Sequence, residues 1–211
     1  MKLQYKHTMT ACFIGYIVQA IVNNFVPLLF VMFQNSYRIP LSKITALITV
    51  NFFVQLLVDM LSAGLIDKIG YRKAILSAHI FSAAGLICLT FLPDLLFDPF
   101  IGILISVIIY AVGGGLLEVL VSPIIEACPT DNKEKAMSLL HSFYCWGHVG
   151  VVLISTAFFA VFHIYNWKFL AFFWAIIPAL NTVLFAKVPI YSLHEDGTRG
   201  LTWKELFSKN I

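Results

Sequence analysis

The apolar residues of this chain fall into six long runs, and charged residues, Pro, Asn or Asp mark the ends of each run. A helix needs about 20 predominantly apolar residues to cross the hydrocarbon layer of a bilayer. Each run meets this length, so the pattern predicts six membrane spans. We place them at about residues 8–33, 41–66, 73–93, 99–127, 137–163 and 167–190.

Each of these spans is expected to be a helix. The bilayer core contains no water to satisfy backbone groups, so only helices and closed β-barrels cross it. A barrel would require shorter segments in which polar and apolar residues alternate, and the sequence lacks such segments. The predicted fold class is therefore an all-α membrane protein, with a bundle of six transmembrane helices over residues 1–190.

The composition supports a membrane protein. With 60% hydrophobic and 12% charged residues, the chain has too little polar surface to cover a soluble globule of 211 residues. Two tryptophans, Trp167 and Trp174, are expected at the membrane interface or facing lipid. The four cysteines are scattered, without the paired spacing of a metal site or a disulfide framework, so we expect no metal and no cofactor.

The basic residues predict the orientation, because cytoplasmic loops carry an excess of Lys and Arg. With both termini in the cytoplasm, that side holds eleven of the 14 basic residues: Lys2, Lys6, Lys68, Arg72, Lys73, Lys133, Lys135, Lys187, Arg199, Lys204 and Lys209. The net charge of +3 then follows from topology, and no nucleic-acid partner is expected. We expect a multi-pass protein of the plasma (inner) membrane.

The turn between the second and third spans reads "SAGLIDKIGYRKA" over residues 62–74. It resembles the loop of the major facilitator superfamily, which carries Gly, any residue, Leu, any residue, Asp, Arg or Lys, any residue, Gly and then basic residues. The matching residues are Asp67, Lys68, Gly70, Arg72 and Lys73. The resemblance implies that these residues form a cytoplasmic gate between two halves of a transporter.

The gating loop departs from the family pattern at two positions. Ala63 replaces the leading glycine, and Tyr71 stands where the family often has its first arginine. A small residue at position 63 still permits close helix approach. Asp59 lies within about two turns of the same end of its helix, and we expect a salt bridge or a gate with nearby basic residues there.

A second, narrower resemblance concerns the fourth span, "GGGLLEVLVSPIIEACP" at residues 113–129. It is similar to the fucose-permease group of sugar transporters, and Glu118 occupies the position of that group's cavity glutamate. Ser122 and Pro123 stand where that group commonly has Asn and Pro, and "VNNF" at residues 22–25 also matches. The aspartate that the best-known members carry shortly afterwards is absent, with Pro27 near that position.

The superfamily fold has twelve spans in two similar halves, so the resemblance implies that this chain is the N-terminal half, built as a 3+3 repeat. Residues 191–211 are then expected to begin the central cytoplasmic loop, with a short amphipathic helix at the membrane surface. The chain is interpreted as a fragment whose partners are membrane lipid and the missing C-terminal six-helix half.

Polar residues inside the spans recur at helical spacing. In the family fold, the first, second, fourth and fifth helices line the central pathway, and these helices carry most of the polar groups, whereas the third and sixth carry chiefly His79 and Asn181. The expected solute ligands are Gln19, Asn23, Asn24, Asn51, Gln55, His141, Tyr144 and His148. For the five amides, simple hydrogen bonding between helices is the alternative. Amides beside the aromatic residues Tyr144 and Trp146 suit an uncharged, polyhydroxylated solute such as a sugar.

Glu118 is the one acidic residue in the middle of an otherwise apolar span. A carboxylate at mid-membrane costs roughly 2.5 kcal/mol or more on insertion scales, so it is expected to face a cavity. Because a low dielectric favours the neutral form of a carboxylic acid, we expect Glu118 to bind a coupling proton.

The predicted function is proton-coupled uptake of a sugar or similar small polar solute. One alternative is an efflux antiporter of drugs or metabolites with the same fold; exporters of the family carry a glycine-and-proline motif in the fifth helix, and "SFYCWGHVGVVLIS" has no proline. A remote alternative is an intramembrane enzyme using His141, His148 and Glu118, but no catalytic spacing such as His-Glu-any-any-His is present.

Overall fold

The computed structural model describes residues 4–191, apart from the side chains of residues 63 and 67, and its regular structure in that range is helical. Six helices are long and apolar enough to cross a membrane, which confirms the predicted number of spans. The elements are α1 (Tyr5–Asn24), η1 (Val26–Leu29), α2 (Phe30–Tyr37), α3 (Leu41–Ile69), α4 (Tyr71–Leu95), α5 (Pro99–Glu126), α6 (Lys133–Phe162), η2 (Ile164–Asn166) and α7 (Trp167–Lys187). The tail at residues 192–211, with its expected amphipathic helix, lies outside the described residues.

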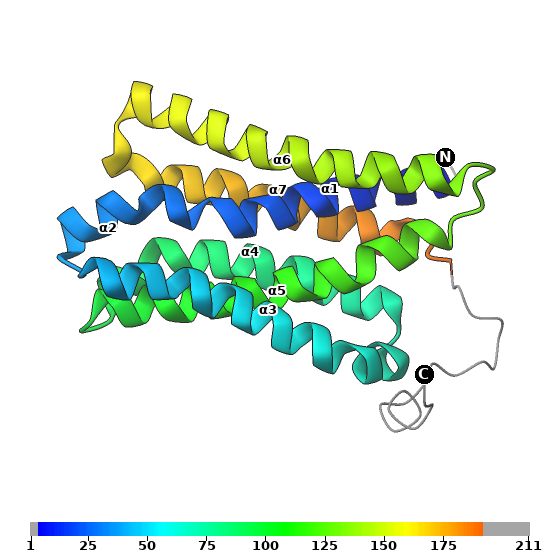
Figure 1. Ribbon diagram of the computed structural model, residues 1–211, viewed down its shortest axis with the longest axis horizontal. Helices are drawn as coiled ribbons and strands as arrows, with labels where there is room; N and C mark the ends of the chain where they lie inside the picture. The colour runs from blue at the N-terminus through cyan, green and yellow to red at the C-terminus, as the bar shows by residue number, and fades with distance from the viewer. Residues whose placement is uncertain (1–3, 192–211) are drawn as a thin grey trace.

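The helices run lengthwise beside one another in a bundle (Figure 1). The helix α4 packs along α5 and α7, while α1 packs against α6, α5 and α7, and α3 packs against α5. The helices α3 and α6 lie at opposite edges of the view in Figure 1 and are the least buried of the six spans, whereas α1 and α5 are among the most buried. The bundle therefore leaves much of α3 and α6 uncovered.

The first span is broken rather than continuous. The helix α1 ends at Asn24, a turn of 3₁₀-helix follows at Val26–Leu29, and α2 continues to Tyr37. Pro27 lies in this turn, and proline cannot donate a backbone hydrogen bond to the carbonyl four residues earlier. The prediction of one unbroken span over 8–33 missed this break. The apolar pattern is the same whether or not Pro27 has a backbone N–H group, so it does not reveal the missing hydrogen bond.

The turn between α3 and α4 is shorter than the polar link expected from the sequence. Only Gly70 separates the two helices, with φ +83° and ψ 150°. A positive φ is accessible to glycine at little cost because it has no Cβ atom. The helices therefore include Lys68 at the end of α3 and Arg72 in the first turn of α4.

Close contact between α4 and α5 depends on glycine. A Cβ atom at Gly85 would lie 2.5 Å from the backbone nitrogen of Tyr110, and one at Gly102 would lie 2.5 Å from the carbonyl carbon of Leu92. A Cβ atom at Gly113 would lie 2.5 Å from the carbonyl oxygen of Ala78. Small residues at these points bring the two backbones together, as is usual between helices in membranes.

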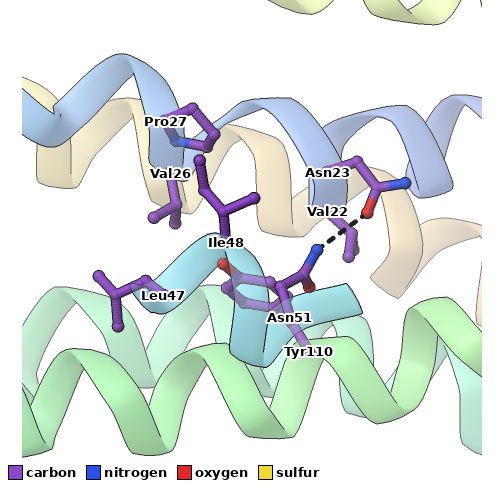
Figure 2. A pocket seen from close by; sticks show the side chains of 8 residues that line it. All are labelled: Val22, Asn23, Val26, Pro27, Leu47, Ile48, Asn51 and Tyr110. Carbon is purple, nitrogen blue, oxygen red and sulfur yellow. Dashed lines mark hydrogen bonds between the residues drawn. The ribbon is translucent and has the colours of Figure 1, made fainter. Parts of the chain in front are cut away.

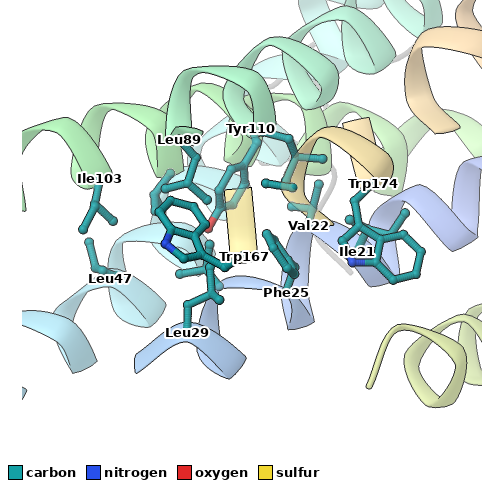
Figure 3. Close-up of a cluster of buried hydrophobic side chains, with 14 of the residues drawn as sticks. Ile21, Val22, Phe25, Leu29, Leu47, Leu89, Ile103, Tyr110, Trp167 and Trp174 are labelled. Carbon is teal, nitrogen blue, oxygen red and sulfur yellow. The ribbon is translucent and has the colours of Figure 1, made fainter. Parts of the chain in front are cut away.

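A buried apolar cluster fills the end of the bundle around the broken first span (Figure 3). Trp167 and Trp174 belong to this cluster, so the expectation that they face lipid is wrong. Trp167 packs edge-on against Phe33 with ring centroids 5.8 Å apart, and Trp174 Nε1 donates to Ser155 Oγ at 3.2 Å. Both residues fix α7 against its neighbours in the bundle.

We predict that Gly85→Ala destabilises the bundle by about 1–3 kcal/mol, the usual cost of overpacking. The added methyl group would meet the Tyr110 backbone and could be accommodated only by separating α4 from α5. Thermal unfolding in detergent micelles measures the effect. Gly150→Ala is the matched control, because its Cβ atom would have no neighbour within 4 Å; equal stability of the two variants would refute the close-contact interpretation.

Candidate functional site

A network of side-chain hydrogen bonds joins α1, α3 and α5 near the middle of the bundle. Gln19 Nε2 on α1 donates to Gln55 Oε1 on α3 at 3.0 Å and to Glu118 Oε2 on α5 at 3.4 Å. Gln55 Nε2 in turn donates to Asn23 Oδ1 at 2.8 Å. Three residues predicted separately from helix spacing are thereby linked to the acidic residue of the fourth span.

Asn23 extends the network to α6. Its Oδ1 accepts from Gln55 and also from Asn51 Nδ2, the latter at 3.2 Å, while its Nδ2 donates to Tyr144 OH at 3.3 Å. Both ends of the amide are therefore used. The result is a polar connection across all four helices that the sequence predicted to line the pathway.

A second contact between α1 and α6 involves Asn24 and His148. Asn24 Nδ2 donates to the carbonyl of Ala20 at 2.8 Å and lies 2.9 Å from His148 Nδ1. Since the carbonyl can only accept, the amide nitrogen is the donor in both contacts, and His148 Nδ1 accepts. The neutral His148 ring then carries its proton on Nε2, and it packs edge-on against Tyr144 with centroids 4.3 Å apart.

The sequence analysis missed Tyr16 as a member of the site. Its hydroxyl lies 3.0 Å from Ser122 Oγ on α5, and its ring lies 5.8 Å from that of His141 and 5.6 Å from that of Tyr144. The ring of Tyr16 thus links His141 to Tyr144 and, through Tyr144, to the other predicted site residues. The signal was available, because Tyr16 precedes Gln19 by three residues and so shares its helix face.

Glu118 lies where the network meets the uncovered surface. Its side chain is exposed, whereas Gln19 is only 2% exposed. The one ion pair among the described residues joins Lys168 to Asp94 at the end of the bundle, so no cation within residues 4–191 pairs with Glu118. Asp59 on the neighbouring α3 is close enough for the two acidic groups to interact electrostatically. The Glu118 carboxylate is therefore accessible at the surface of this chain and has no cationic partner within residues 4–191.

The run Gly113–Gly115 places α5 against three helices at once. A Cβ atom at Gly113 would meet Ser82 and Ala78 of α4. One at Gly114 would lie 3.2 Å from Gln19 Oε1 of α1 and 3.2 Å from Gln55 Cδ of α3, and one at Gly115 would lie 2.8 Å from Val58 Cβ of α3. The absence of a side chain at Gly114 lets the two amides lie directly against α5. The glycine run is thus a packing device that allows the network to form.

The pocket beside the network is small and partly open. A cavity of about 10 Å³ lies between Asn23, Pro27, Asn51, Tyr110 and four apolar residues, Val22, Val26, Leu47 and Ile48 (Figure 2). Pockets for small molecules usually measure about 300–1,000 Å³. A solute therefore does not fit in this cavity, and the polar surface open to one is the face that carries Glu118, Tyr144 and His141.

The eight expected solute ligands divide by burial. Gln19, Asn51 and Gln55 are each at most 4% exposed, and they lie inside the bundle beneath the open face. Asn23, Asn24, Tyr144 and His148 are half-buried, and His141 is exposed. The structure thus separates residues that could touch a solute from residues that hold those groups in place.

In the predicted gating loop, Lys68, Gly70 and Lys73 are exposed, and the side chain of Asp67 lies outside the described residues. Asp59 is half-buried, and its Oδ1 has no hydrogen-bond partner among the described residues. No ion pair of Asp59 is found in that part of the chain, so the expected salt bridge does not form within it.

Arg72 has a role that the sequence did not predict. Its guanidinium donates to three backbone carbonyls at the end of α7, those of Phe185 at 2.8 Å, Ala186 at 2.9 Å and Val188 at 2.9 Å. The last carbonyls of a helix have no partner in the helix and carry partial negative charge. Arg72 therefore caps α7 and ties it to the α3–α4 turn.

A separate buried contact joins α1, α4 and α7 on the far side of α1. Asn181 Nδ2 donates to the carbonyl of Ala11 at 2.9 Å and lies 2.8 Å from His79 Nε2, while His79 Nδ1 lies 2.8 Å from the carbonyl of Ile75. The carbonyl requires a donor at Nδ1, so Nε2 accepts from Asn181. The polar residues of the third and sixth spans thus bond to one another away from the network, although Asn181 Oδ1 has no partner among the described residues.

We predict that Arg72→Ala lowers the stability of the bundle by about 1 kcal/mol, because the end of α7 loses its positively charged cap. Unfolding in detergent micelles measures the change. Lys73→Ala is the control, since Lys73 is an exposed neighbour of the same charge; a loss shared by both variants would point to a general charge effect and against capping.

We further predict that Gln55→Leu costs about 1 kcal/mol of stability, since interhelical hydrogen bonds in membrane proteins contribute about 0.6 kcal/mol each on average. Leucine preserves the size of the side chain but cannot bond to Gln19 or Asn23. Thr45→Val on the same helix is the control, because the Thr45 hydroxyl bonds only to carbonyls of its own helix. A Gln55→Leu variant as stable as the control variant would show that the network contributes nothing to the fold.

Among the described residues, no group of three His, Cys, Asp or Glu side chains is arranged to hold a metal ion. A search of curated protein sequences found no match to this chain. Two solved structures are similar to it. The proton:xylose symporter XylE bound to 6-bromo-6-deoxy-D-glucose matches with a TM-score of 0.77 and 15% identity, over 89% of this chain and 45% of the symporter.

The second structure, a POT family transporter in complex with 5-aminolevulinic acid, matches with a TM-score of 0.64 and 19% identity, over 96% of this chain and 41% of that transporter. This chain thus spans less than half the length of either protein. At these identities the two likenesses show the fold alone. Residues 10–211 match the Major Facilitator Superfamily as a sequence family. The chain is therefore a member of the major facilitator superfamily, a family of transporters and not of enzymes, and it corresponds to about half of the fold.

Proposed function

We propose that this chain is the N-terminal half of a transporter that couples the uptake of a sugar, or a similar uncharged polar solute, to the movement of a proton. The observation that carries the proposal is the state of Glu118: an exposed carboxylate in a membrane span, bonded to Gln19 and without a cationic partner within residues 4–191. Intramembrane acidic groups of this kind are functional by default.

The side chains beside Glu118 support an uncharged, hydroxyl-bearing solute. Tyr144 and His141 offer a hydroxyl and an imidazole at the open face, and Asn23 and Asn24 lie half-buried behind them. Lys and Arg are confined to the ends of α1, α3 and α6, and α5 contains neither. A site without a fixed positive charge does not favour an anion, whereas hydroxyl groups can exchange hydrogen bonds with amides, imidazole and phenol.

The arrangement of the polar groups supports a site shared between two halves. Glu118, His141 and Trp146 are exposed on α5 and α6, although a polar group facing lipid would be costly. A second six-helix half placed against this face would enclose a solute near the middle of the membrane. Alternating access then follows from rocking one half against the other around that site.

Protonation of Glu118 supplies the coupling. With the carboxylate ionised, closing the site would bury a charge without a partner, which is strongly unfavourable. With a proton bound, the neutral carboxylic acid keeps its contact with Gln19 and the site can close over the solute. Proton and solute together then favour the closed state, which is the differential binding that a coupled carrier needs.

We place both termini in the cytoplasm and the protein in the plasma (inner) membrane. Seven of the ten basic residues within residues 4–191 lie at the end of the bundle that holds Lys68, Lys73 and Lys187, and this excess supports the orientation. In this arrangement the α3–α4 turn and the Arg72 cap lie on the cytoplasmic side, and the broken part of the first span lies toward the outside.

The test is Glu118→Gln in the complete transporter, with radiolabelled sugars offered to vesicles. The variant keeps an amide that Gln19 can contact but cannot exchange a proton. We expect it to lose accumulation driven by a pH gradient and to retain solute exchange at equal concentrations on both sides. The matched control is Glu126→Gln, an exposed acidic residue at the end of the same helix.

Uphill accumulation by Glu118→Gln equal to that of Glu126→Gln would contradict the coupling role. Failure of every sugar in the panel to exchange, with the protein folded, would contradict the solute class. The two parts of the proposal are thus tested separately.

A further inference from the structure

The hydrogen bonds between Glu118 and Tyr144 all have the same polarity. Gln19 donates both to the Glu118 carboxylate and to Gln55. Gln55 then donates to Asn23, and Asn23 donates to the hydroxyl of Tyr144. We propose that this chain of hydrogen bonds is a relay with two orientations, through which protonation of Glu118 reverses the hydrogen-bonding role of Tyr144 toward the solute. The inference rests on the proposed function and connects its proton site to its solute site.

An ionised Glu118 fixes the orientation that the structure shows. A carboxylate can only accept hydrogen bonds, so Gln19 must present its Nε2 and not its Oε1 to Glu118. Gln19 Nε2 uses its other hydrogen on Gln55 Oε1, at 3.0 Å. Gln55 is thereby left with Nε2 as its free end, and this nitrogen donates to Asn23 Oδ1 at 2.8 Å. The charge of one residue thus sets the direction of each later amide.

A protonated Glu118 permits the opposite orientation. The carboxylic acid has an O–H group, which can donate to Gln19 Oε1 once that amide has turned end for end. The terminal torsion of a Gln or Asn side chain is broad and roughly two-fold, so this turn exchanges the oxygen and the nitrogen in place. Gln55 then donates to Gln19, and Asn23 donates to Gln55. Asn23 Oδ1 comes to face Tyr144 and accepts from its hydroxyl.

Asn51 takes part in the reversal as a branch of the relay. Its Nδ2 donates to Asn23 Oδ1 at 3.2 Å, whereas its Oδ1 has no partner among the described residues (Figure 2). After the reversal Asn51 Oδ1 would accept from Asn23 Nδ2. All five hydrogen bonds of the relay are then kept, each with its donor and acceptor exchanged. The two orientations therefore contain the same number of bonds.

The two amides that bond through one end only can turn without losing a partner. Gln19 is 2% exposed and Asn51 is 4% exposed, yet Gln19 Oε1 and Asn51 Oδ1 have no hydrogen-bond partner among the described residues. A Cβ atom at Gly114 would lie 3.2 Å from Gln19 Oε1. Because glycine has no such atom, the larger NH₂ group can take the place of this oxygen. Turning either amide thus breaks no bond at its unpartnered end.

Glu118 is the charged group that controls the relay. Asp59 of α3 and Tyr16 of α1 interact electrostatically with it. The other titratable side chains that face inward on the packed helices are His141 and Tyr144 of α6, which lie against the Tyr16 ring, and His79 of α4, which bonds to Asn181. No cation within residues 4–191 pairs with Glu118, and Gln19 is its one hydrogen-bond donor in that range. A change in its protonation therefore acts first on the Gln19 amide.

The reversal changes what Tyr144 offers to a solute. While Glu118 is ionised, the Tyr144 oxygen accepts from Asn23, and the hydroxyl hydrogen is free to donate. After the reversal Asn23 takes that hydrogen, and the oxygen is free to accept from a solute hydroxyl. A solute hydroxyl that donates to Tyr144 is then bound more tightly by the protonated form. By linkage, its binding favours protonation of Glu118 to the same extent.

Infrared difference spectroscopy of the complete transporter in lipid tests the relay. The C–O stretching band of a tyrosine differs in frequency between a hydroxyl that donates and one that accepts, and Tyr144→Phe identifies the band of Tyr144. We expect this band to shift as the pH is lowered and the acid C=O band of Glu118 appears. Gln55→Leu interrupts the relay and should abolish the Tyr144 shift while the Glu118 band remains. Thr45→Val on the same helix is the matched control and should keep both, because Thr45 bonds only within its own helix.

Three outcomes would overturn the relay. A Glu118 acid band that appears while the Tyr144 band stays fixed in the unmodified protein would do so and leave proton coupling intact. An equal Tyr144 shift in Gln55→Leu would show that the proton acts on Tyr144 by another route. The absence of a Glu118 acid band at either pH would contradict both the relay and the proposed coupling. The first and third outcomes are read from the unmodified protein, so they decide the question even where Gln55→Leu fails to fold.

Discussion

The structure depends on the requirement that polar groups inside a bilayer find their partners within the protein, because lipid offers none. The amides of Gln19, Asn23 and Gln55 meet this requirement in part, by bonding to one another across α1 and α3. His79 and Asn181 meet it separately between α4, α7 and the backbone of α1. The requirement is not met in full among the described residues, where buried oxygens of Gln19, Asn51, Asp59 and Asn181 have no hydrogen-bond partner. The Glu118 carboxylate differs from these because it reaches the uncovered face, with one long contact to Gln19.

Close backbone packing is what allows these bonds to form. Gly85 and Gly102 bring α4 and α5 together, and Gly114 lets the amides of Gln19 and Gln55 lie against α5. Arg72 adds a tie at one end of the bundle by capping α7. These contacts hold α1, α4, α5 and α7 together on one side of the bundle, while α3 and α6 remain largely uncovered. A closely packed half with one open polar face agrees with the rocking mechanism proposed above.

Periodicity and hydrophobicity were enough to predict the six helices and the faces on which Gln19, Asn23, Gln55 and Tyr144 lie, because these features are local. The sequence pattern did not predict the break at Pro27, because proline removes one backbone hydrogen bond and leaves the apolar pattern unchanged. Trp167 and Trp174 pack inward and do not face lipid. The sequence did not show this, because a tryptophan near a span end has the same pattern whether it packs inward or outward. The cap made by Arg72 and the contact of Tyr16 with Ser122 join residues distant in the sequence, which no local pattern encodes.

The exchange of a proton at Glu118, as proposed above, is open to direct observation. Infrared spectroscopy of the transporter in lipid, recorded as the pH is stepped between the acidic and neutral values of the two compartments, observes this directly. The account predicts a carboxylic-acid C=O band that appears at the acidic end, disappears at the neutral end and shifts when solute is added, and that is missing from the Glu118→Gln spectrum. A spectrum in which Glu118 contributes only ionised carboxylate bands throughout would contradict the account.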